Sequence, residues 1–329
     1  MENNVENVRY HTDRIAILLA TYNGEQYLRD QLDSLLSQTC QDWVTYIHDD
    51  GSTDQTMKVI EEYTTKYPQK FVKVDGISTG GAKKNFFYLL SCVDAPYLMC
   101  CDQDDVWLPE KVEVTFQAMK QLEQEYEDSG NRETEIPLLV FTELRVVDGK
   151  LNTIAERMSA IQQLECNRNR VEDIMVQNNV TGCTMMINRC LLRMMNGSDP
   201  KHPVDVNQVI MHDWWCALIA AEYGKMKFIG TPTILYRQHG DNSVGAKNVR
   251  SAGYAAEKLT KFQEIQNSLE LTRNQAVEFQ KSFGLPDQHV VSRYGQIGHK
   301  NKLARLTFYK ENHISKSGKS RQIGFLIFG

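Results

Sequence analysis

The sequence of 329 residues lacks several features that would place it in other classes of protein. No run approaches the ~18–20 consecutive apolar residues of a membrane-spanning helix. The polar, acidic segment 1–7 lacks both the basic and the apolar part of a signal peptide. The net charge of −5 and the pI of about 5.9 argue against a basic surface that binds nucleic acid. We therefore expect a cytoplasmic chain with no nucleic-acid partner.

Regularly paired cysteines are also lacking. The eight cysteines are Cys40, Cys92, Cys100, Cys101, Cys166, Cys183, Cys190 and Cys216. They form no CxxC pair, and most of them stand inside apolar runs. A zinc site or a disulfide framework requires a recognisable cysteine spacing. The sequence therefore predicts free thiols in a reducing compartment.

Apolar runs and helical spacings alternate through the first half of the chain. Continuous apolar runs predict buried strands at 15–20, 43–47, 71–74 and 97–101. Apolar residues at helical spacing predict helices over 27–36, 52–63 and 85–93 between them. Strands separated by helices of this length indicate βαβ units and a mainly parallel sheet.

The second half continues the sheet and then becomes helical. We predict an acidic, solvated helix over 121–135, strands at 138–141, 180–187, 226–229 and 233–237, and a helix over 213–223. Beyond 248 the periodicity is helical until the terminus. We therefore predict a domain over 1–248 and a mostly helical extension over 249–329.

Three carboxylates follow the strand at 97–101: Asp102, Asp104 and Asp105. Clustered carboxylates repel one another and cost stability unless a cation shares them. Mg²⁺ takes few protein carboxylates and leaves positions open for substrate oxygens. The alternative is that these acids cap the helix that begins near Leu108. The residues alone leave a metal site and a helix cap open for these three acids.

Other polar motifs stand where the neighbouring strands end. Thr21, Tyr22 and Asn23 follow the first strand, and Asp49 and Asp50 follow the second. Ligands of parallel sheets bind beyond the carboxyl ends of the strands, so these motifs belong to one site. The segment 79–85, with two glycines, two lysines and a following helix, favours an anion.

Taken in order, the segments 17–24, 49–54 and 102–105 resemble the inverting nucleotide-sugar glycosyltransferases of family 2. The resemblance covers about residues 14 to 245, and it rests on three motifs in the correct order and spacing. It implies an α/β fold of the GT-A type. That fold is a single Rossmann-like nucleotide-binding domain with a mixed, mainly parallel sheet, to which the helical extension is appended.

The resemblance also implies roles on the donor side. Tyr22 lies under the nucleotide base with Thr21 and Asn23 beside it, although a buried core aromatic is the alternative for Tyr22. Asp50 accepts the imide N–H of uracil or thymine, unless the pair Asp49–Asp50 only forms a turn into Gly51. The resemblance also divides the three acids: Asp104 is assigned to Mg²⁺ or Mn²⁺, Asp102 to the metal and the ribose, and Asp105 to the helix start. Lys84 and Asn85 are assigned to the donor, with a solvated lysine pair as the alternative at 83–84.

On the acceptor side, the resemblance makes Asp213 the general base, with an N-cap as the alternative role. His212, Trp214, Trp215 and Gly182 are expected to face the acceptor sugar, although one of the two tryptophans is expected in the core. His239 completes the metal site, unless it is structural. Arg237 is expected to steer phosphate oxygens.

The predicted activity is metal-assisted transfer of rhamnose or a related hexose in bacterial surface polysaccharide synthesis. The donor is a nucleoside diphosphate sugar, dTDP-rhamnose before UDP-hexoses, and the acceptor is a saccharide or a lipid-linked saccharide. Two alternatives are a nucleotidyltransferase that makes nucleotide sugars and a catalytically silent nucleotide-sugar-binding protein. The first would need a glycine-rich activating loop, which the segment 21–24 does not provide.

The segment 299–328 combines seven basic residues with an apolar end. We interpret it either as a peripheral contact with the cytoplasmic face of an anionic inner membrane or as a solvated helix followed by a segment that packs on the core. A homodimer contact is a further role for the extension.

Overall fold

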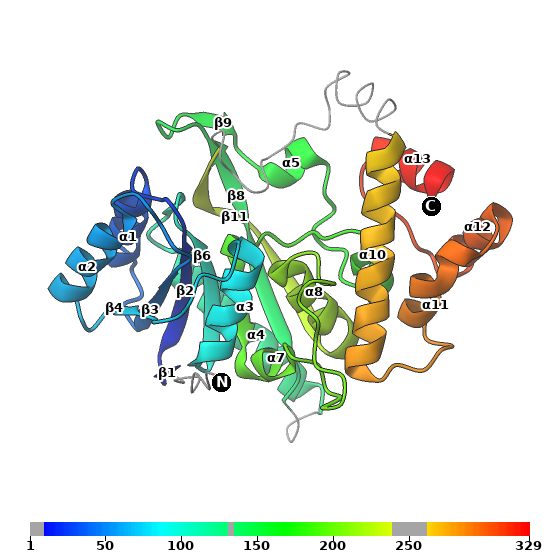
Figure 1. Cartoon of the computed structure of the whole chain (residues 1–329), viewed down its shortest axis with the longest axis horizontal. Helices are drawn as coiled ribbons and strands as arrows, with labels where there is room; N and C mark the ends of the chain where they lie inside the picture. The colour runs from blue at the N-terminus through cyan, green and yellow to red at the C-terminus, as the bar shows by residue number, and fades with distance from the viewer. Residues whose placement is uncertain (1–9, 131–134, 239–261) are drawn as a thin grey trace, which may run out of the picture.

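A computed structural model describes residues 10–130, 135–238 and 262–329 (Figure 1). A mixed nine-stranded sheet forms its centre, and β2, a run of seven buried residues, lies within it. The strands in spatial order are β4 (Phe71–Lys73), β3 (Trp43–Asp49), β2 (Ile15–Thr21), β6 (Tyr97–Asp102), β10 (Met185–Asn188), β8 (Leu138–Val147), β11 (Lys225–Arg237) and β7 (Val106–Trp107), with β9 (Thr153–Ala155) paired to β8. A separate pair joins β1 (Tyr10–His11) to β5 (Val93–Asp94).

The first four strands in this order are parallel, as their alternation with helices predicts. Strand β10 then runs antiparallel to both of its neighbours, and β11 runs parallel to β8. The result is a mixed sheet with a parallel nucleotide-binding half. This arrangement confirms the predicted fold class.

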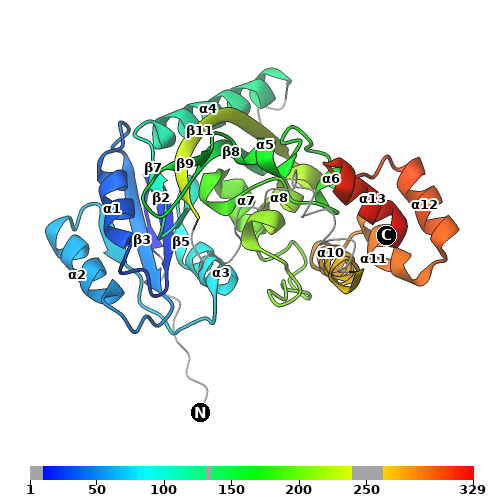
Figure 2. The same ribbon diagram turned by 90° about the horizontal axis from the view of Figure 1, so that it is seen from above.

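Helices cover both faces of the sheet (Figure 2). Alternate residues of β2 point to opposite faces, so that Ile17 joins one core cluster and Leu18 the other. The helices on the Ile17 side are α1 (Leu28–Leu36), α2 (Thr56–Lys66) and α4 (Lys111–Asp128). The helices on the Leu18 side include α3 (Ala82–Cys92), α6 (Val171–Ile174), α7 (Arg189–Met194) and α8 (His212–Tyr223).

The C-terminal helices are α10 (Phe262–Phe283), α11 (Val290–Gln296), the short 3-10 helix η2 (Ile297–His299), α12 (Lys302–Glu311) and α13 (Lys319–Phe328). Of these helices, α10 packs against α8. The ring of Phe279 on α10 lies 5.2 Å from that of Trp215 on α8, edge to face. The described part of the extension therefore shares the core of one sheet face, while the predicted boundary near 248 lies outside the described residues.

Two strand predictions need correction. The strand predicted over 180–187 begins only at Met185, because Thr184 bonds back to the carbonyl of Thr181 and closes the 3-10 turn η1 (Gly182–Thr184). The two strands predicted at 226–229 and 233–237 are one strand, β11, whose register shifts on either side of Pro232. Proline lacks an N–H and is tolerated at such an irregularity.

The predicted helix over 121–135 is the second half of α4, which ends at Asp128. Among the described helices, none has both the length and the apolar character needed to cross a bilayer.

Candidate active site

Three parallel strands end at the same edge of the sheet. Thr21 of β2 lies opposite Asp49 of β3, and Ala20 lies opposite Asp102 of β6. The hydroxyl of Thr21 donates to the Asp49 carboxylate at 2.9 Å. The register therefore brings the three predicted strand-end motifs to one edge.

The loop after β2 presents Tyr22 to solvent, with 56% of its surface exposed. Its core-aromatic alternative is therefore wrong, and the ring is available to a flat ligand. Asn23 adopts a positive φ of 47°, and its side-chain oxygen accepts from the N–H of Thr53 at 2.8 Å. In this structure the Asn23 side chain braces the loop against the segment after β3.

The two acids after β3 have different roles. Asp49 accepts from the N–H groups of Gly51 and Ser52 at 3.1 and 2.8 Å, so it forms the predicted turn. Asp50 is buried and accepts from the N–H groups of Thr79, Gly80 and Gly81. Burial alone would raise its pKa, but these hydrogen bonds, first from Gly81 and Thr79, lower it below the usual value.

The anion held by the glycine-rich segment is therefore Asp50 itself. The prediction of an anion at 79–85 fits the geometry, although the anion is a side chain of the protein. Within the structure the Asp50 carboxylate already has four or more donors, so a nucleotide base would have to replace some of them.

The two residues of α3 that were predicted to contact the sugar donor, Lys84 and Asn85, differ in burial. Lys84 is exposed and has no partner among the described residues, which leaves it available to a phosphate. Asn85 is buried: its Oδ1 lies 2.8 Å from His48 Nδ1, and its Nδ2 donates to the His48 carbonyl at 3.2 Å. Its side chain supports the end of β3, and this removes it from the set of donor contacts. Lys83 instead donates to the carbonyl of Val209 at 2.6 Å.

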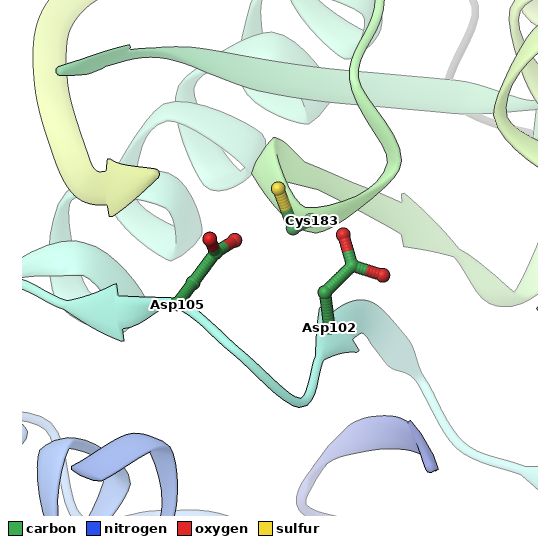
Figure 3. A group of neighbouring side chains, drawn as sticks. All are labelled: Asp102, Asp105 and Cys183. Atoms are coloured by element: carbon green, nitrogen blue, oxygen red, sulfur yellow. The ribbon is translucent and has the colours of Figure 1, made fainter. Parts of the chain in front are cut away.

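The acids after β6 form a cluster with a thiol (Figure 3). One oxygen each of Asp102 and Asp105 and the sulfur of Cys183 lie within 4.8 Å of one another. Asp105 is fully buried and its Oδ1 accepts from the N–H of Arg237 at 3.0 Å. Helix α4 is capped by Glu110, without a side-chain bond, so the assignment of Asp105 to the helix start is wrong.

Asp104 lies between the two clustered acids in the chain, with intermediate exposure. Burial, and then the charge of Asp104, raises the pKa of Asp102 to about 7. Burial and the same neighbour raise the pKa of Asp105. The charge of Asp104 therefore disfavours the charged forms of Asp102 and Asp105.

This cluster fits a divalent cation. The Oδ2 atom of Asp105 is buried without a hydrogen-bond partner among the described residues, and a cation would offset the mutual repulsion of the acids. Carboxylate oxygens suit Mg²⁺ and Mn²⁺, whereas the Cys183 sulfur suits softer metals. A possible acidic metal site is thus present at the end of β6.

Arg237 lies behind the acids and is almost completely buried. Its guanidinium donates to the carbonyls of Asp104 and Gly149 at 2.9 and 3.0 Å, and to the Asp30 carboxylate at 2.8 Å. The expectation that Arg237 steers phosphate oxygens is therefore wrong: this side chain holds the acidic loop in place.

Asp213 lies in the first turn of α8, and it is buried. The N-cap is Met211, so the N-cap alternative for Asp213 is wrong. Its Oδ1 accepts from Asn178 Nδ2 at 3.2 Å and from the N–H of Trp214 at 2.6 Å. Burial raises its pKa to about 7, although hydrogen bonds from Trp214, Gly182 and Asn178 act in the opposite direction. Asp213 also raises the pKa of Asp102, which places the two carboxylates in one electrostatic field.

His212 packs beneath this carboxylate. Its ring stacks on Phe86 of α3 at 4.1 Å, and neither ring nitrogen has a partner among the described residues. A Cβ at Gly182 would lie 2.6 Å from its Nε2. Burial lowers the pKa of His212 to about 3, so the ring is neutral. Gly182 and His212 thus pack against each other next to Asp213.

The two tryptophans of α8 differ in burial, as expected. Trp215 is fully buried and donates to the carbonyl of Met195 at 3.1 Å, which removes it from the set of acceptor contacts. Trp214 is partly exposed, and its indole N–H donates to the carbonyl of Ile174 at 2.6 Å.

His239, the third predicted metal ligand, lies outside the described residues.

Sequence reasoning missed Gln103, Asn178 and Cys183, which support the site from neighbouring loops. Gln103 stands inside the acidic motif, so its position carried a signal. Asn178 and Cys183 come close to the site only through tertiary contacts, and their local sequence gives no such signal.

The chain is similar to known glycosyltransferases. Residues 16–132 match the family model described as Glycosyl transferase family 2. The chain is 29% identical over 243 residues to the dTDP-rhamnosyl transferase RfbG of Shigella flexneri, covering 72% of this chain and 76% of that protein. A shorter stretch of 94 residues is 37% identical to protein Rv1520 of Mycobacterium tuberculosis, covering 28% of this chain and 27% of that one.

The fold is also similar to that of a solved structure. The crystal structure of S. aureus TarS 1-349 in complex with UDP superposes with a TM-score of 0.51 at 14% identity. The match covers 87% of this chain and 71% of that one. It shows a shared architecture.

Proposed function

Since this chain is a glycosyltransferase with a family 2 domain, we propose that it moves a sugar from a nucleoside diphosphate donor to a saccharide hydroxyl with inversion at the anomeric carbon. The observation that carries the proposal is the placement of Asp213. A buried carboxylate with a raised pKa lies within the field of the acidic cluster, at the ligand-binding end of the sheet. This placement supports a base close to a leaving-group site.

The donor side is assigned to the exposed strand ends. Tyr22 offers a flat face for the base, and Lys84 offers a positive charge for the diphosphate. Asp50 would accept the imide N–H in exchange for some of the donors of segment 78–81 that now hold its carboxylate. The similarity to RfbG, named as a dTDP-rhamnosyl transferase, favours dTDP-rhamnose, and UDP-hexoses are the alternative donors. The acceptor is a surface-polysaccharide saccharide, free or lipid-linked.

Asp213 acts on the acceptor in this proposal. Its carboxylate accepts the proton of the attacking hydroxyl, and that oxygen forms a bond to the anomeric carbon. The bond from this carbon to the diphosphate oxygen breaks, and the nucleoside diphosphate leaves with the electron pair. Asn178 and the Gly182 N–H keep the carboxylate oriented during the transfer.

Asp102 and Asp105, whose carboxylates lie in one cluster, would hold Mg²⁺ or Mn²⁺ together with Asp104, which stands between them in the chain. The ion, when bound, would neutralise the negative charge on the departing diphosphate. Two contacts of Arg237 hold the acidic loop in the position where the diphosphate would bind. Its guanidinium donates to the Asp104 carbonyl, and its backbone N–H donates to the Asp105 carboxylate. All eight cysteines are free in the structure, which supports a cytoplasmic setting.

The test measures nucleoside diphosphate release with purified protein, Mn²⁺ and an acceptor mixture of saccharides. dTDP-rhamnose is compared with UDP-hexoses, and the anomeric configuration of the product is read by NMR. We expect release with dTDP-rhamnose, inversion, and loss of turnover in Asp213→Asn and Asp104→Ala. Unchanged turnover in both variants, or a product with retained configuration, would overturn the mechanism.

A further inference from the structure

The terminal helix α13 carries an apolar stripe on its solvent side. Ile323, Leu326 and Ile327 are 55%, 41% and 43% exposed. Their spacing of three and four residues places them on one helix face. The other face is packed, since the ring of Phe325 is buried 4.5 Å from that of Tyr309 on α12. The stripe is therefore additional to the face that attaches α13 to the protein.

Positive charge surrounds this stripe. Lys319 lies one turn before Ile323 on the same face, and Lys302 and Lys310 are exposed on the adjoining α12. None of these three lysines has a partner among the described residues. Residues 302–328 contain six basic side chains and a single acidic one, Glu311. An apolar face with a basic border is the pattern of a helix that lies in the interface of an anionic membrane.

The position of α13 relates the stripe to the acceptor side. Arg321 donates to the carbonyls of Gln162 and Gln163, at the end of α5 (Met158–Gln162). Figures 1 and 2 both show α13 beside α5. An open depression of about 720 Å³ lies between these helices, and Lys319 and Ile323 line it.

Helix α5 reaches the candidate site from its other end. The Thr181 hydroxyl lies 4.0 Å from the sulfur of Met158, and Thr181 precedes Gly182 in the chain. A surface bound at α13 would therefore be close to the side of the molecule from which we expect the acceptor to enter.

We propose that α13 docks the protein on an anionic membrane. Ile323, Leu326 and Ile327 enter the boundary between headgroups and acyl chains, and the neighbouring lysines contact lipid phosphates. This docking goes beyond the proposed reaction, because it requires neither the donor nor the acceptor sugar. A second copy of the chain fits the surface less well. Three side chains are far fewer than the roughly 20–30 residues a side of a standard interface, and two facing copies would bring lysines together.

The experiment is co-sedimentation of the full chain with sucrose-loaded vesicles, without nucleotide. Vesicles of phosphatidylcholine with about 30% phosphatidylglycerol are compared with pure phosphatidylcholine at low and high salt. We expect binding to the anionic vesicles that weakens with salt. The double variant Ile323→Gln/Ile327→Gln and the variant Lys319→Glu should each weaken that binding by about tenfold.

Matched control variants distinguish binding through α13 from nonspecific binding to the vesicles. Leu271→Gln on α10 and Lys58→Glu on α2 change exposed residues of the same types elsewhere, and should bind vesicles as the parent does. Thermal unfolding and binding of dTDP should be unchanged in all four variants, so a failure of docking is separable from a failure of the proposed reaction.

The proposal is overturned if the parent does not bind anionic vesicles, or if the α13 variants bind as tightly as the matched variants. Light scattering detects the rival occupant. A dimer that Ile323→Gln/Ile327→Gln dissociates, together with absent vesicle binding, would assign the stripe to a second copy.

Discussion

Gln103 holds both backbone polar groups of Tyr22. Its Oε1 accepts from the Tyr22 N–H at 2.8 Å, and its Nε2 donates to the Tyr22 carbonyl at 2.8 Å. Gly24 makes room for this contact, since a Cβ there would lie 2.3 Å from Gln103 Oε1. The residue between two acids of the metal motif thus fixes the loop that presents the aromatic ring.

Replacing Gln103 by alanine should therefore weaken nucleotide binding. Two hydrogen bonds, each worth about 0.5–1.5 kcal/mol net, hold the loop, so we expect about a tenfold higher Kd for dTDP. Isothermal titration calorimetry measures this change. Gln117→Ala, at an exposed position on α4, is the matched control and should bind like the parent. Equal affinities in the two variants would show that the loop keeps its conformation without Gln103.

The parallel half of the sheet was predictable because each strand is a continuous apolar run, as in Ile15–Thr21, and because local helical spacing separates the strands. The strand-end motifs followed from the same argument, since parallel strands place their carboxyl ends together. Burial explains the error at Asn85, a predicted donor contact whose side chain turns into the core. Burial also decides which of the two tryptophans of α8 is the expected core residue, namely Trp215.

The sequence also could not show which groups Asp50 and Arg237 contact. Asp50 and Arg237 are charged residues at a ligand-binding edge, which favours ligand contacts, yet both are occupied by groups of the protein. These partners lie 31 and 207 residues away in the chain, so only the folded structure reveals them.

Asp213 should make stability depend on pH. Its pKa in the folded protein, about 7, is above the value of about 3.9 in an unfolded chain, so the folded state binds the proton more tightly. The resulting stabilisation is complete below pH 4 and is lost as the pH rises through 7. Asp213→Asn has no such proton, so its Tm should exceed that of the parent increasingly between pH 5 and pH 8. Calorimetry in the presence of EDTA measures the difference. A constant difference across this range would contradict the raised pKa.

Asn178 should act as a positioning residue for the base. Its Nδ2 donates to Asp213 Oδ1 at 3.2 Å and thereby favours the carboxylate over the acid. The parent should lose kcat/KM on the acid side of about pH 7, because the base must be deprotonated. In Asn178→Ala this limb should move to higher pH by roughly half to one unit, with a lower rate near pH 7.

The measurement is kcat/KM for the donor between pH 5.5 and pH 9 at saturating Mn²⁺. Asn207→Ala, which removes an exposed amide that donates to Asp205, is the matched control and should keep the parent profile. A purely structural role for Asn178 would lower the rate equally at all pH values and leave the limb in place.

Gly182 should tolerate no side chain, since a Cβ there would lie 2.6 Å from His212 Nε2 and 3.7 Å from Asp213 Cβ. His212 cannot easily move away, because its ring stacks on Phe86 at 4.1 Å. Overpacking of this kind costs about 1–3 kcal/mol, so Gly182→Ala should lower both the Tm and kcat. Binding of dTDP should remain, because the Tyr22 loop is held by Gln103 and not by Gly182. Gly230→Ala is the control: the nearest atom to its added methyl would be 3.9 Å away, on Phe228. If Gly182→Ala retained parental kcat, then the packing of His212 beneath Asp213 would have no part in orienting the base.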